Sequence, residues 1–388
     1  MPKRVIILGS TGSIGCNALS VAESLPGEFE IVGLAGNRSW EKMAEQAARH
    51  RPSFVVLTDE ASASRLAERL RTESPSTKVW SGRQGLVRLV KEAPCDFVLS
   101  AVVGIAGMEA TLAAAERGMC IGLANKESLV VAGSLLVDAA HRGGSQLLPV
   151  DSEHSAIFQS LHSGAREEIE RIFLTASGGP FRTWSLERMK QATVADAMRH
   201  PTWAMGPKIT IDSATMMNKA LEIIEARWLF DVEPYRIEVV IHPESIIHSM
   251  VAFHDGSVVA QMGRPDMRAP IQYAMTYPRR LAGSCDRLNF SKLERMHFEP
   301  PDHERFPSLR LGHEVSNLGG TAGAALNGAN EAAVTAFRDG RIGFLDIVAI
   351  VEDVLHRHSF EAHPSLETLM RVDAWARSEV AECCSVKS

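Results

Sequence analysis

The chain has 388 residues, more than one hydrophobic core usually serves, so two or three domains are expected. Hydrophobic residues make up 45% of the chain and charged residues 23%, a balance that excludes a largely disordered protein. The net charge of −6 argues against nucleic-acid binding, which needs a basic surface. No apolar run is long enough to cross a bilayer, so a membrane is not expected as a partner either.

The six cysteines are scattered along the chain, and none forms a C-x-x-C pair. This pattern is typical of free thiols in a reducing compartment. The apolar run at 5–8 is too short for the core of a signal peptide and favours a buried strand. We therefore expect a cytoplasmic protein. The sequence defines no role for the adjacent Cys383 and Cys384.

Residues 1–150 alternate short apolar runs with amphipathic segments. The runs 5–8, 31–34, 54–57, 97–101 and 120–124 have the composition of buried strands, and the segments 40–50 and 61–71 have helical spacing. This alternation predicts an α/β domain with a doubly wound parallel sheet. The run 147–150 begins the next part of the chain.

The remaining chain divides into three parts. Residues 151–285 mix helices with β-branched runs at 237–241 and 257–262, which predicts a central α+β domain with an open sheet. Residues 286–310 contain Pro300, Pro301 and Pro307 and are expected to form a surface connector. Residues 311–388 show helical spacing at 324–337, 344–356 and 365–382, which predicts a C-terminal helical bundle.

Three glycines, Gly9, Gly12 and Gly15, follow the first expected strand and open a helix. This spacing allows a tight turn, and the N–H groups of the helix start then face a pyrophosphate. The strand before and the helix after favour a dinucleotide site over a glycine-rich turn without a ligand.

The end of the second expected strand, at 34–39, indicates which nucleotide binds. A site for NAD usually has an acid there, whereas this segment has no acid and contains Arg38. A guanidinium attracts the 2′-phosphate that a carboxylate would repel, so NADPH is expected. The alternative is that Arg38 is an ordinary solvated arginine.

The motif Asp151-Ser152-Glu153 follows the run 147–150, at the expected carboxyl end of a strand. In extended chain, residues i and i+2 project to the same side, so both carboxylates are expected to converge on one cation. Oxygen ligands favour Mg²⁺ or Mn²⁺, with Co²⁺ as a further option. A D-x-E motif alone is common in polar loops and helix caps.

Residues 211–228 have the pattern of a helix that Ser213 would cap. Asn218, Lys219 and Glu222 fall together beside an apolar stripe. The hydroxyl, amide and ammonium suit a phosphate, and the carboxylate suits a metal ion. The alternative is a solvated helix face with one ion pair.

Two further segments suit a phosphate pocket and a lid. Ser177 lies in a glycine-rich turn that offers a hydroxyl and backbone N–H groups. His200 lies in a loop at about 199–207, bounded by Pro and Gly, that also carries Trp and Met. A closing lid and ordinary burial of these apolar side chains are both open. Lys126, after an expected strand, is a candidate for a substrate oxygen or a plain surface lysine.

The chain resembles the 1-deoxy-D-xylulose 5-phosphate reductoisomerase family over nearly its whole length. The order of several long strings carries the resemblance. They are GSTGSIG (9–15), ANKE (124–127), PVDSEH (149–154), SGGPFR (177–182), HPTWAMG (200–206), DSATMMNKALE (212–222), IHPESIIHSMV (241–251), RPDMRAPI (264–271) and ALNGANE (325–331). Glu244 stands where the family string is expected to hold Gln.

The resemblance implies an N-terminal NADPH-binding domain, a catalytic domain with a mobile lid, a C-terminal bundle and a homodimer. It implies three metal ligands, Asp151, Glu153 and Glu222. The implied substrate contacts are Lys126, Ser152, Glu153, Ser177, His200, Ser213, Asn218, Lys219 and Glu222, of which Lys126, Glu153, His200 and Glu222 would be catalytic. The implied NADPH contacts are Thr11, Gly12, Ser13, Ile14, Gly36, Asn37, Arg38, Ser39, Asn125, Glu127 and Gly206.

The implied reaction is rearrangement and reduction of a small phosphorylated sugar, 1-deoxy-D-xylulose 5-phosphate, in isoprenoid precursor biosynthesis. Two other functions stay open at this point. One is an NADP-dependent dehydrogenase of another phosphorylated sugar, without rearrangement. The other is a nucleotide-sensing regulatory protein that keeps the fold but has no turnover, which the intact set of three acids argues against.

Overall fold

The computed structural model describes residues 1–203, 205–293 and 295–386, which form two compact units. Unit 1 comprises Met1–Ser128, Leu135–Ser155 and Asp266–Asp286, and unit 2 comprises Leu129–Ser134, Ala156–Pro265 and Arg287–Ser388. The division into parts 1–150, 151–285, 286–310 and 311–388 stays a prediction. Ala204 of the expected lid and residues 387–388 of the expected bundle lie outside the described residues.

Unit 1 is built on a seven-stranded parallel sheet with the order β4-β3-β2-β1-β5-β6-β7. Its strands are β1 (Lys3–Leu8), β2 (Phe29–Gly36), β3 (Phe54–Leu57), β4 (Lys78–Ser81), β5 (Phe97–Ser100), β6 (Cys120–Leu123) and β7 (Leu147–Pro149). The strand order changes direction at β1, which is where doubly wound sheets bind their ligands. The predicted α/β class with a doubly wound sheet is confirmed.

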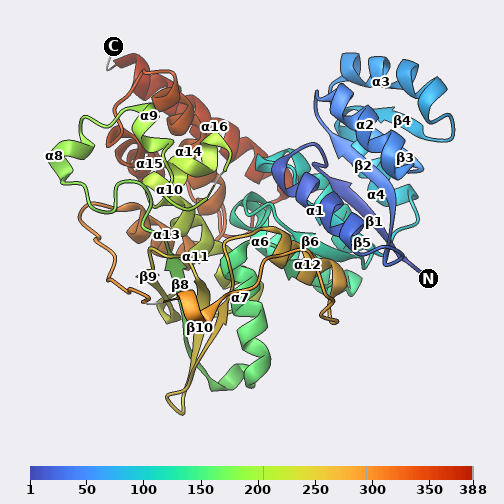
Figure 1. Cartoon of the computed structure of the whole chain (residues 1–388). Coiled ribbons are helices and arrows are strands. Elements are labelled where there is room, and N and C mark those ends of the chain that lie inside the picture. The colour runs from blue at the N-terminus through green and yellow to red at the C-terminus, as the bar shows by residue number, and fades with distance from the viewer. Residues whose placement is uncertain (204, 294, 387–388) are drawn as a thin grey trace. The chain divides into compact units, whose positions relative to one another are not determined.

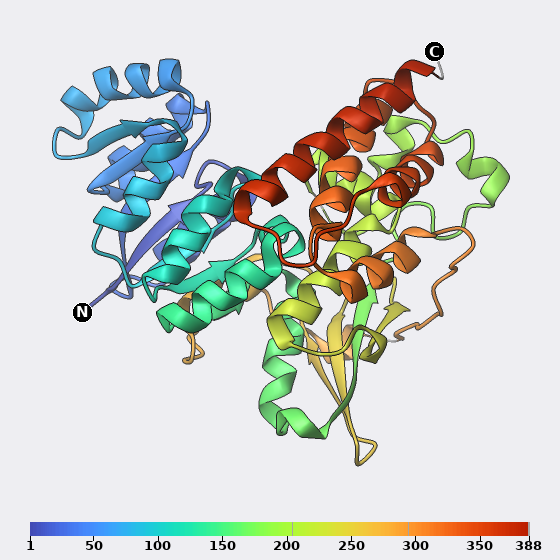
Figure 2. The same cartoon turned by 180° about the vertical axis from the view of Figure 1, so that it is seen from behind.

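Helices cover both faces of this sheet (Figures 1 and 2). They are α1 (Ser13–Ser24), α2 (Trp40–His50), α3 (Glu60–Glu73), α4 (Gly82–Glu92), the 3₁₀ turn η1 (Gly104–Gly107), α5 (Met108–Glu116) and α12 (Arg268–Thr276). Two helices, α6 (Glu127–Gly143) and α7 (Ser152–Ser160), contain residues of both units. The helix α12 returns late in the chain to pack against α1, and Lys3 Nζ donates a hydrogen bond of 2.7 Å to the carbonyl of Met275.

Unit 2 contains a four-stranded mixed sheet with the order β11-β10-β8-β9. Its strands are β8 (Ile169–Ala176), β9 (Ile237–Ile241), β10 (Ile247–Phe253) and β11 (Val258–Met262). Only the pair β8 and β9 is parallel within this sheet, so these two strands end side by side. The predicted open sheet in the central part of the chain is therefore confirmed.

The helices of unit 2 share one core with this sheet. They are α8 (Leu186–Met189), α9 (Val194–Ala197), α10 (Pro207–Ala214), α11 (Met217–Phe230), α13 (Ser308–Leu318), α14 (Ala322–Arg338), α15 (Asp346–Arg357) and α16 (Leu366–Val386). The 3₁₀ turns are η2 (Leu161–Ser163), η3 (Arg166–Glu168), η4 (Pro234–Arg236) and η5 (Phe290–Lys292). The helix α14 packs against both α15 and α16 (Figure 2), and α11 packs against α13 and the strands β8 and β9. Among the described residues, no helix is both long and apolar enough to cross a membrane.

Two local predictions are wrong. Asp151 and Glu153 do not lie in extended chain, because α7 begins at Ser152, where the Ser155 N–H donates to the Asp151 carbonyl at 2.8 Å. Acidic residues favour this position because the first turn of a helix carries partial positive charge.

The second error concerns Ser213, which does not cap a helix. It lies in the last turn of α10, and α11 begins only at Met217. Met216 between the helices has φ +60, and the Thr215 hydroxyl accepts the Met217 N–H at 3.3 Å. The N-cap of α11 is Met216, which makes no side-chain capping hydrogen bond, so the expected cap is absent from this helix start.

Candidate active site

The glycine turn of unit 1 joins β1 to α1 at the carboxyl ends of the strands. Gly9 has φ +91, and a Cβ there would lie 2.4 Å from the Ala101 carbonyl oxygen. A Cβ on Gly15 would lie 2.4 Å from the Gly9 carbonyl oxygen. The helix begins after Gly12 without a side-chain cap. The turn therefore requires glycine and presents the backbone N–H groups of Ser13 and Ile14 at a helix start, which suits an anion.

The next strand end carries the residues expected at the ribose. Gly36 ends β2, and a Cβ there would lie 3.1 Å from the Thr11 hydroxyl oxygen, so these two expected contacts lie together. The Asn37 side-chain oxygen accepts the Thr58 hydroxyl at 2.8 Å. Ser39 directly precedes α2, where its carbonyl accepts the Met43 N–H at 3.0 Å.

Arg38 is 79% exposed and pairs loosely with Asp59, at 3.5 Å. The Asp59 carboxylate is already engaged, because it caps α3 through the Ser62 N–H at 2.9 Å. The hydrogen bonds from Ser62, with a smaller contribution from Arg38, lower the pKa of Asp59. Arg38 is therefore largely available for a phosphate, although the chain does place one acid near it.

Asn125, Lys126 and Glu127 are all buried at the start of α6. The Asn125 amide donates to the carbonyls of Val102 and Gly104, the latter at 2.7 Å, and its oxygen accepts the Ser128 N–H at 2.8 Å. This side chain therefore fixes the loop after β5. A direct contact of Asn125 or Glu127 with the cofactor stays a prediction.

Lys126 and Asp151 form a close ion pair of 2.7 Å, with both side chains largely buried. Burial by itself would raise the pKa of Asp151, but the ammonium of Lys126, with smaller contributions from His154 and Glu153, lowers it well below its usual range. The Ser152 hydroxyl donates to Glu153 at 2.5 Å. Unit 1 thus brings together the carboxylates of Asp151 and Glu153 and the Ser152 hydroxyl. The Lys126 ammonium lies beside Asp151, where a metal ion would otherwise balance the charge.

The first turns of α11, in unit 2, hold three expected residues in one buried network. The Asn218 amide and the Lys219 ammonium each donate to one carboxylate oxygen of Glu222. Lys219 also donates to the Thr175 carbonyl at the end of β8, at 2.6 Å. Glu222 is 0% exposed and Lys219 4%, so the alternative of a solvated helix face is wrong.

The turn after β8 brings Ser177, His200 and Ser213 to the same place. The Ser177 oxygen lies 3.1 Å from His200 Nε2 and accepts the Gly179 N–H at 3.2 Å. Gly179 has φ +67, and a Cβ there would lie 2.4 Å from the Ser213 carbonyl oxygen. Lys219 reaches the same strand end, so the turn, α10 and α11 converge.

His200 is held as the neutral imidazole. Its Nδ1 accepts two backbone N–H groups, from Thr202 at 3.1 Å and Trp203 at 2.9 Å, and burial lowers the pKa of His200 to about 4. The proton of the neutral ring is therefore on Nε2, which donates to Ser177. Since Ser177 already accepts two hydrogen bonds, its own O–H is left to donate to a ligand.

The described residues of the predicted lid, which are 199–203 and 205–207, include His200 near one end and Pro207, the first residue of α10, at the other. Trp203 and Met205 are partly buried, and the Trp203 ring lies 6.3 Å from the His248 ring. Gly206 is exposed and directly precedes α10. Its predicted contact with NADPH, and closure of this loop, stay predictions.

The comparisons with known proteins agree over nearly the whole chain. Three family models match: 1-deoxy-D-xylulose 5-phosphate reductoisomerase at residues 5–133, its C-terminal domain at 147–230, and DXP reductoisomerase C-terminal domain at 262–379. The chain belongs to the 1-deoxy-D-xylulose 5-phosphate reductoisomerase family.

Proteins named 1-deoxy-D-xylulose 5-phosphate reductoisomerase are close in sequence. The one from Chloroherpeton thalassium is 48% identical over 378 residues, 97% of each chain. The one from Sinorhizobium fredii is 51% identical over 382 residues, 98% of this chain and 97% of its own.

Solved reductoisomerase structures are similar to this chain over nearly its whole length. The Zymomonas mobilis enzyme in complex with NADPH has a TM-score of 0.93 at 44% identity and covers 99% of both chains. A reductoisomerase in complex with NADPH, fosmidomycin and magnesium has a TM-score of 0.94 at 38% identity, covering 99% of this chain and 98% of its own.

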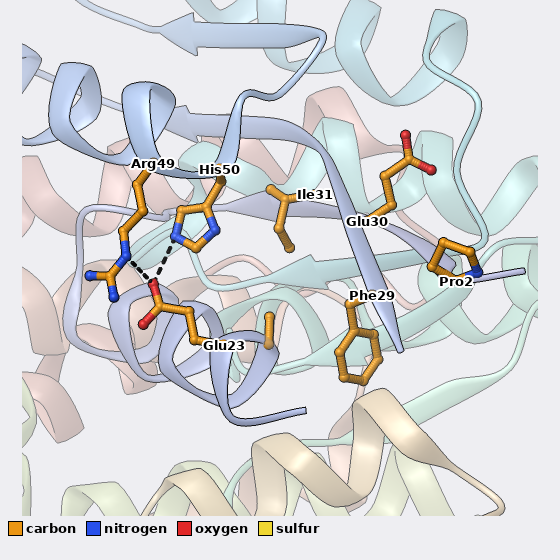
Figure 3. A pocket seen from close by; sticks show the side chains of 8 residues that line it. Pro2, Glu23, Phe29, Glu30, Ile31, Arg49 and His50 are labelled. Atoms are coloured by element: carbon orange, nitrogen blue, oxygen red, sulfur yellow. Dashed lines mark ion pairs between the residues drawn. The ribbon is translucent and has the colours of Figure 1, made fainter. Parts of the chain in front are cut away.

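Unit 1 also contains a hollow of about 420 Å³, which lies away from the glycine turn (Figure 3). It is lined by residues at the amino ends of β1 and β2 and the carboxyl ends of α1 and α2. Glu23 pairs there with Arg49 at 2.8 Å and with His50 at 3.2 Å. Because these charges are paired with each other at the opposite end of the strands, the hollow is not part of the dinucleotide site.

Several residues around the site were not predicted from the sequence. Lys42, in the first turn of α2, donates to the Thr11 carbonyl at 2.9 Å and brings a cation to the glycine turn. Buried Asn330 of α14 donates to buried Asp212 of α10 at 2.9 Å, and Lys208 pairs with the same acid at 2.9 Å. Asp212 and Asn330 lie within the matching strings, but a surface lysine such as Lys42 carried no signal.

Proposed function

We propose that this chain converts 1-deoxy-D-xylulose 5-phosphate to 2-C-methyl-D-erythritol 4-phosphate, using NADPH and a divalent metal ion, in the non-mevalonate pathway to isoprenoid precursors. The family membership over nearly the full length supports the reaction. The observation that carries it is the convergence in unit 2 of a hydroxyl, a neutral imidazole and a buried ammonium–carboxylate pair at one strand end.

The glycine turn of unit 1 fits NADPH because its backbone approaches so closely that side chains are excluded at Gly9 and Gly15. Thr11, Gly12, Ser13 and Ile14 would hold the pyrophosphate, and Gly36 to Ser39 would hold the ribose and its 2′-phosphate. When bound, NADPH supplies the hydride for the reductive stage.

The carboxylates fit a hard cation, since the donor set consists only of oxygen atoms. We propose Asp151, Glu153 and Glu222 as the ligands of Mg²⁺ or Mn²⁺, with Co²⁺ as a further option. A bound metal ion polarises the carbonyl and hydroxyl oxygens of the substrate during the rearrangement. Lys126, which pairs with Asp151 at 2.7 Å, would release this acid and turn to a substrate oxygen.

The remaining residues bind and orient the substrate. Ser177 has its O–H left to donate, and Asn218, Lys219 and Ser213 lie on the adjoining helices, so these four suit the phosphate group. Ser152 and His200 suit the hydroxyl groups of the sugar. The loop carrying His200 would exclude water when it covers the substrate, which strengthens every charge interaction beneath it.

We also propose a cytoplasmic homodimer. Cys16, Cys95, Cys120, Cys285 and Cys383 are free thiols, which suits a reducing compartment. The strand β11 ends the sheet of unit 2, and Val258 on it is 53% exposed, so this edge is where we expect a second copy to add. Sedimentation velocity tests the dimer, and a single species at the monomer mass would contradict it.

Product identity tests the proposed reaction. The purified protein is incubated with 1-deoxy-D-xylulose 5-phosphate, NADPH and Mg²⁺, and the product is analysed by ¹³C NMR. A branched carbon skeleton supports the rearrangement. An unbranched polyol phosphate would identify a plain dehydrogenase, and NADPH binding without turnover would identify a nucleotide sensor.

A further inference from the structure

The loop after β9 lies directly beside the turn that carries Ser177. The parallel strands β8 and β9 end together, with Ala176 opposite Ile241, and the His242 N–H donates to the Ala176 carbonyl at 2.7 Å. This hydrogen bond therefore joins the first residue after β9 to the last residue of β8. A displacement of the loop after β9 would shift Ala176 and with it Ser177, the next residue.

His242 joins this loop to the segment 297–299. The ring is completely buried, and its Nε2 accepts the Ile246 N–H at 3.1 Å. In the neutral ring the proton is therefore on Nδ1, which lies 2.9 Å from the His297 carbonyl and donates to it. The Phe298 ring stacks on the imidazole, with 4.8 Å between centroids and 16° between planes.

Glu244 holds the same segment and also lies beside the His242 ring, with 3.2 Å between its carboxylate and His242 Nδ1. Its carboxylate accepts the His297 backbone N–H at 3.2 Å and pairs with the His297 ring through Nδ1. The side chain of Glu244 is 28% exposed and that of His297 is 59% exposed. Burial would raise the pKa of Glu244, but the hydrogen bonds from the His297 ring and from backbone N–H groups, with a smaller contribution from His242, together lower it.

The segment 297–299, which Glu244 holds, also contacts residues beside the Ser177–Gly179 turn. Ile241 and Glu299 exchange two backbone hydrogen bonds, each 2.9 Å long, and the Glu299 carboxylate pairs with Arg182 at 2.7 Å. The Arg182 side chain lies against Gly178, where a Cβ would approach its Cδ to 2.6 Å. Arg305 also donates to the carbonyl of Arg182 at 2.9 Å.

We propose that Glu244 and His297 form a latch that positions the Ser177–Gly179 turn for the phosphate of the substrate. The latch fixes residues 297–299 against β9, and Glu299 then holds Arg182 beside Gly178. Glu244 is a positioning residue, since it acts through this chain of contacts. The inference rests on the proposed function, because it assumes that the turn binds a phosphate.

The test compares Glu244→Ala, His297→Ala and the double variant in steady-state assays with 1-deoxy-D-xylulose 5-phosphate. Each single change should raise KM about fivefold, as expected for one lost charged hydrogen bond, with kcat within about twofold of the wild type. The inhibition constant of inorganic phosphate should rise by a similar factor. Glu244→Gln keeps an acceptor oxygen and should recover most of the lost affinity.

The double variant decides whether the two residues act as one unit. A latch predicts that the KM of the double variant matches that of Glu244→Ala, because this change already removes the carboxylate with which the His297 ring pairs. The matched control is Glu238→Ala on β9, which removes an exposed ion pair with Arg171 of β8 and should leave KM unchanged.

The failures of the two proposals are distinguishable. An inactive wild-type protein would overturn the proposed function. An active wild type with unchanged KM in Glu244→Ala and His297→Ala, or with effects that multiply in the double variant, would overturn the latch alone. His297 is largely exposed, so its variant tests the latch even if Glu244→Ala does not fold.

Discussion

The glycine turn of unit 1 and the α11 network of unit 2 differ in the groups that they offer to a ligand. We propose that the turn binds through its backbone, and it requires glycine because Cβ atoms at Gly9 and Gly15 would collide with neighbouring backbone. We propose that the α11 network binds through its side chains, with Glu222 and Lys219 buried and paired. The first depends on shape, and the second depends on charge.

This difference decides which substitutions each region tolerates. A buried charge is costly unless its partner is present, so removing one member of the Lys219–Glu222 pair exposes the other to that cost. The glycine turn has no such pair, and damage there should scale with how closely an added methyl group meets its neighbours. Ligand binding at the two regions should therefore be separable by mutation.

The largest effect is expected from Glu222→Gln. The change removes a proposed metal ligand with almost no change in volume, so kcat should fall about a thousandfold while the Kd for NADPH stays within twofold. Steady-state kinetics and NADPH fluorescence measure the two quantities. Glu238→Gln, in an exposed ion pair, is the control. Near-normal kcat in Glu222→Gln would remove this residue from the metal site.

Gly15→Ala should weaken NADPH binding and leave the metal site intact. Its Cβ would lie 2.4 Å from the Gly9 carbonyl, so the turn must move, and strain of about 2 kcal/mol corresponds to a roughly thirtyfold higher Kd for NADPH. Gly12→Ala, where the Cβ would lie 3.3 Å from the same oxygen, should have a smaller effect. Equal losses in the two variants would contradict the argument from shape.

Arg38→Asp tests whether Arg38 contacts the 2′-phosphate of NADPH. Replacing the exposed guanidinium with a carboxylate should lower the ratio of kcat/KM for NADPH to that for NADH at least about tenfold. Lys42→Met, which removes the cation nearest to Thr11, should shift the same ratio less. An unchanged ratio in Arg38→Asp would show that Arg38 does not contact the 2′-phosphate.

The smallest effect is expected from the titration of His200. Burial lowers the pKa of His200 from 6.5 to about 4, so the folded state favours the neutral ring. The contribution of His200 to the free energy of unfolding is fully present above pH 6.5. It is lost as the pH falls towards 4, because the unfolded chain takes up the proton at a higher pH than the folded chain. His200→Gln should therefore lose less Tm than the wild type across this window.

The control for His200→Gln is His363→Gln, which changes an exposed histidine in the same unit. Its Tm should follow the wild-type pH profile. If both variants follow that profile, the neutral state of His200 does not contribute to stability.

Regular elements and matched strings were predictable, while contacts between elements were not. Strong apolar runs located six of the seven strands of unit 1, but Lys78–Ser81 was missed because it is a short edge strand with no buried residue. The helical start at Ser152 was missed because the D-x-E spacing fits an extended chain equally well.

The site was predictable only as far as local spacing determines it. Helical spacing placed Asn218, Lys219 and Glu222 on one face, which the structure confirms. The pairing of Lys126 with Asp151 and the approach of Asp59 to Arg38 join separate strand ends, and no local pattern records such pairs. These contacts depend on the strand order of the sheet.

The most direct test of the proposed reaction measures turnover and nucleotide binding in the same sample. NADPH oxidation is followed with 1-deoxy-D-xylulose 5-phosphate after treatment with EDTA and again after Mg²⁺ is restored, while NADPH binding is followed by fluorescence. We predict that turnover disappears with the chelator and returns with Mg²⁺, and that NADPH binds throughout. Turnover that persists in EDTA, or that fails to return with Mg²⁺, would contradict a metal-dependent reductoisomerase.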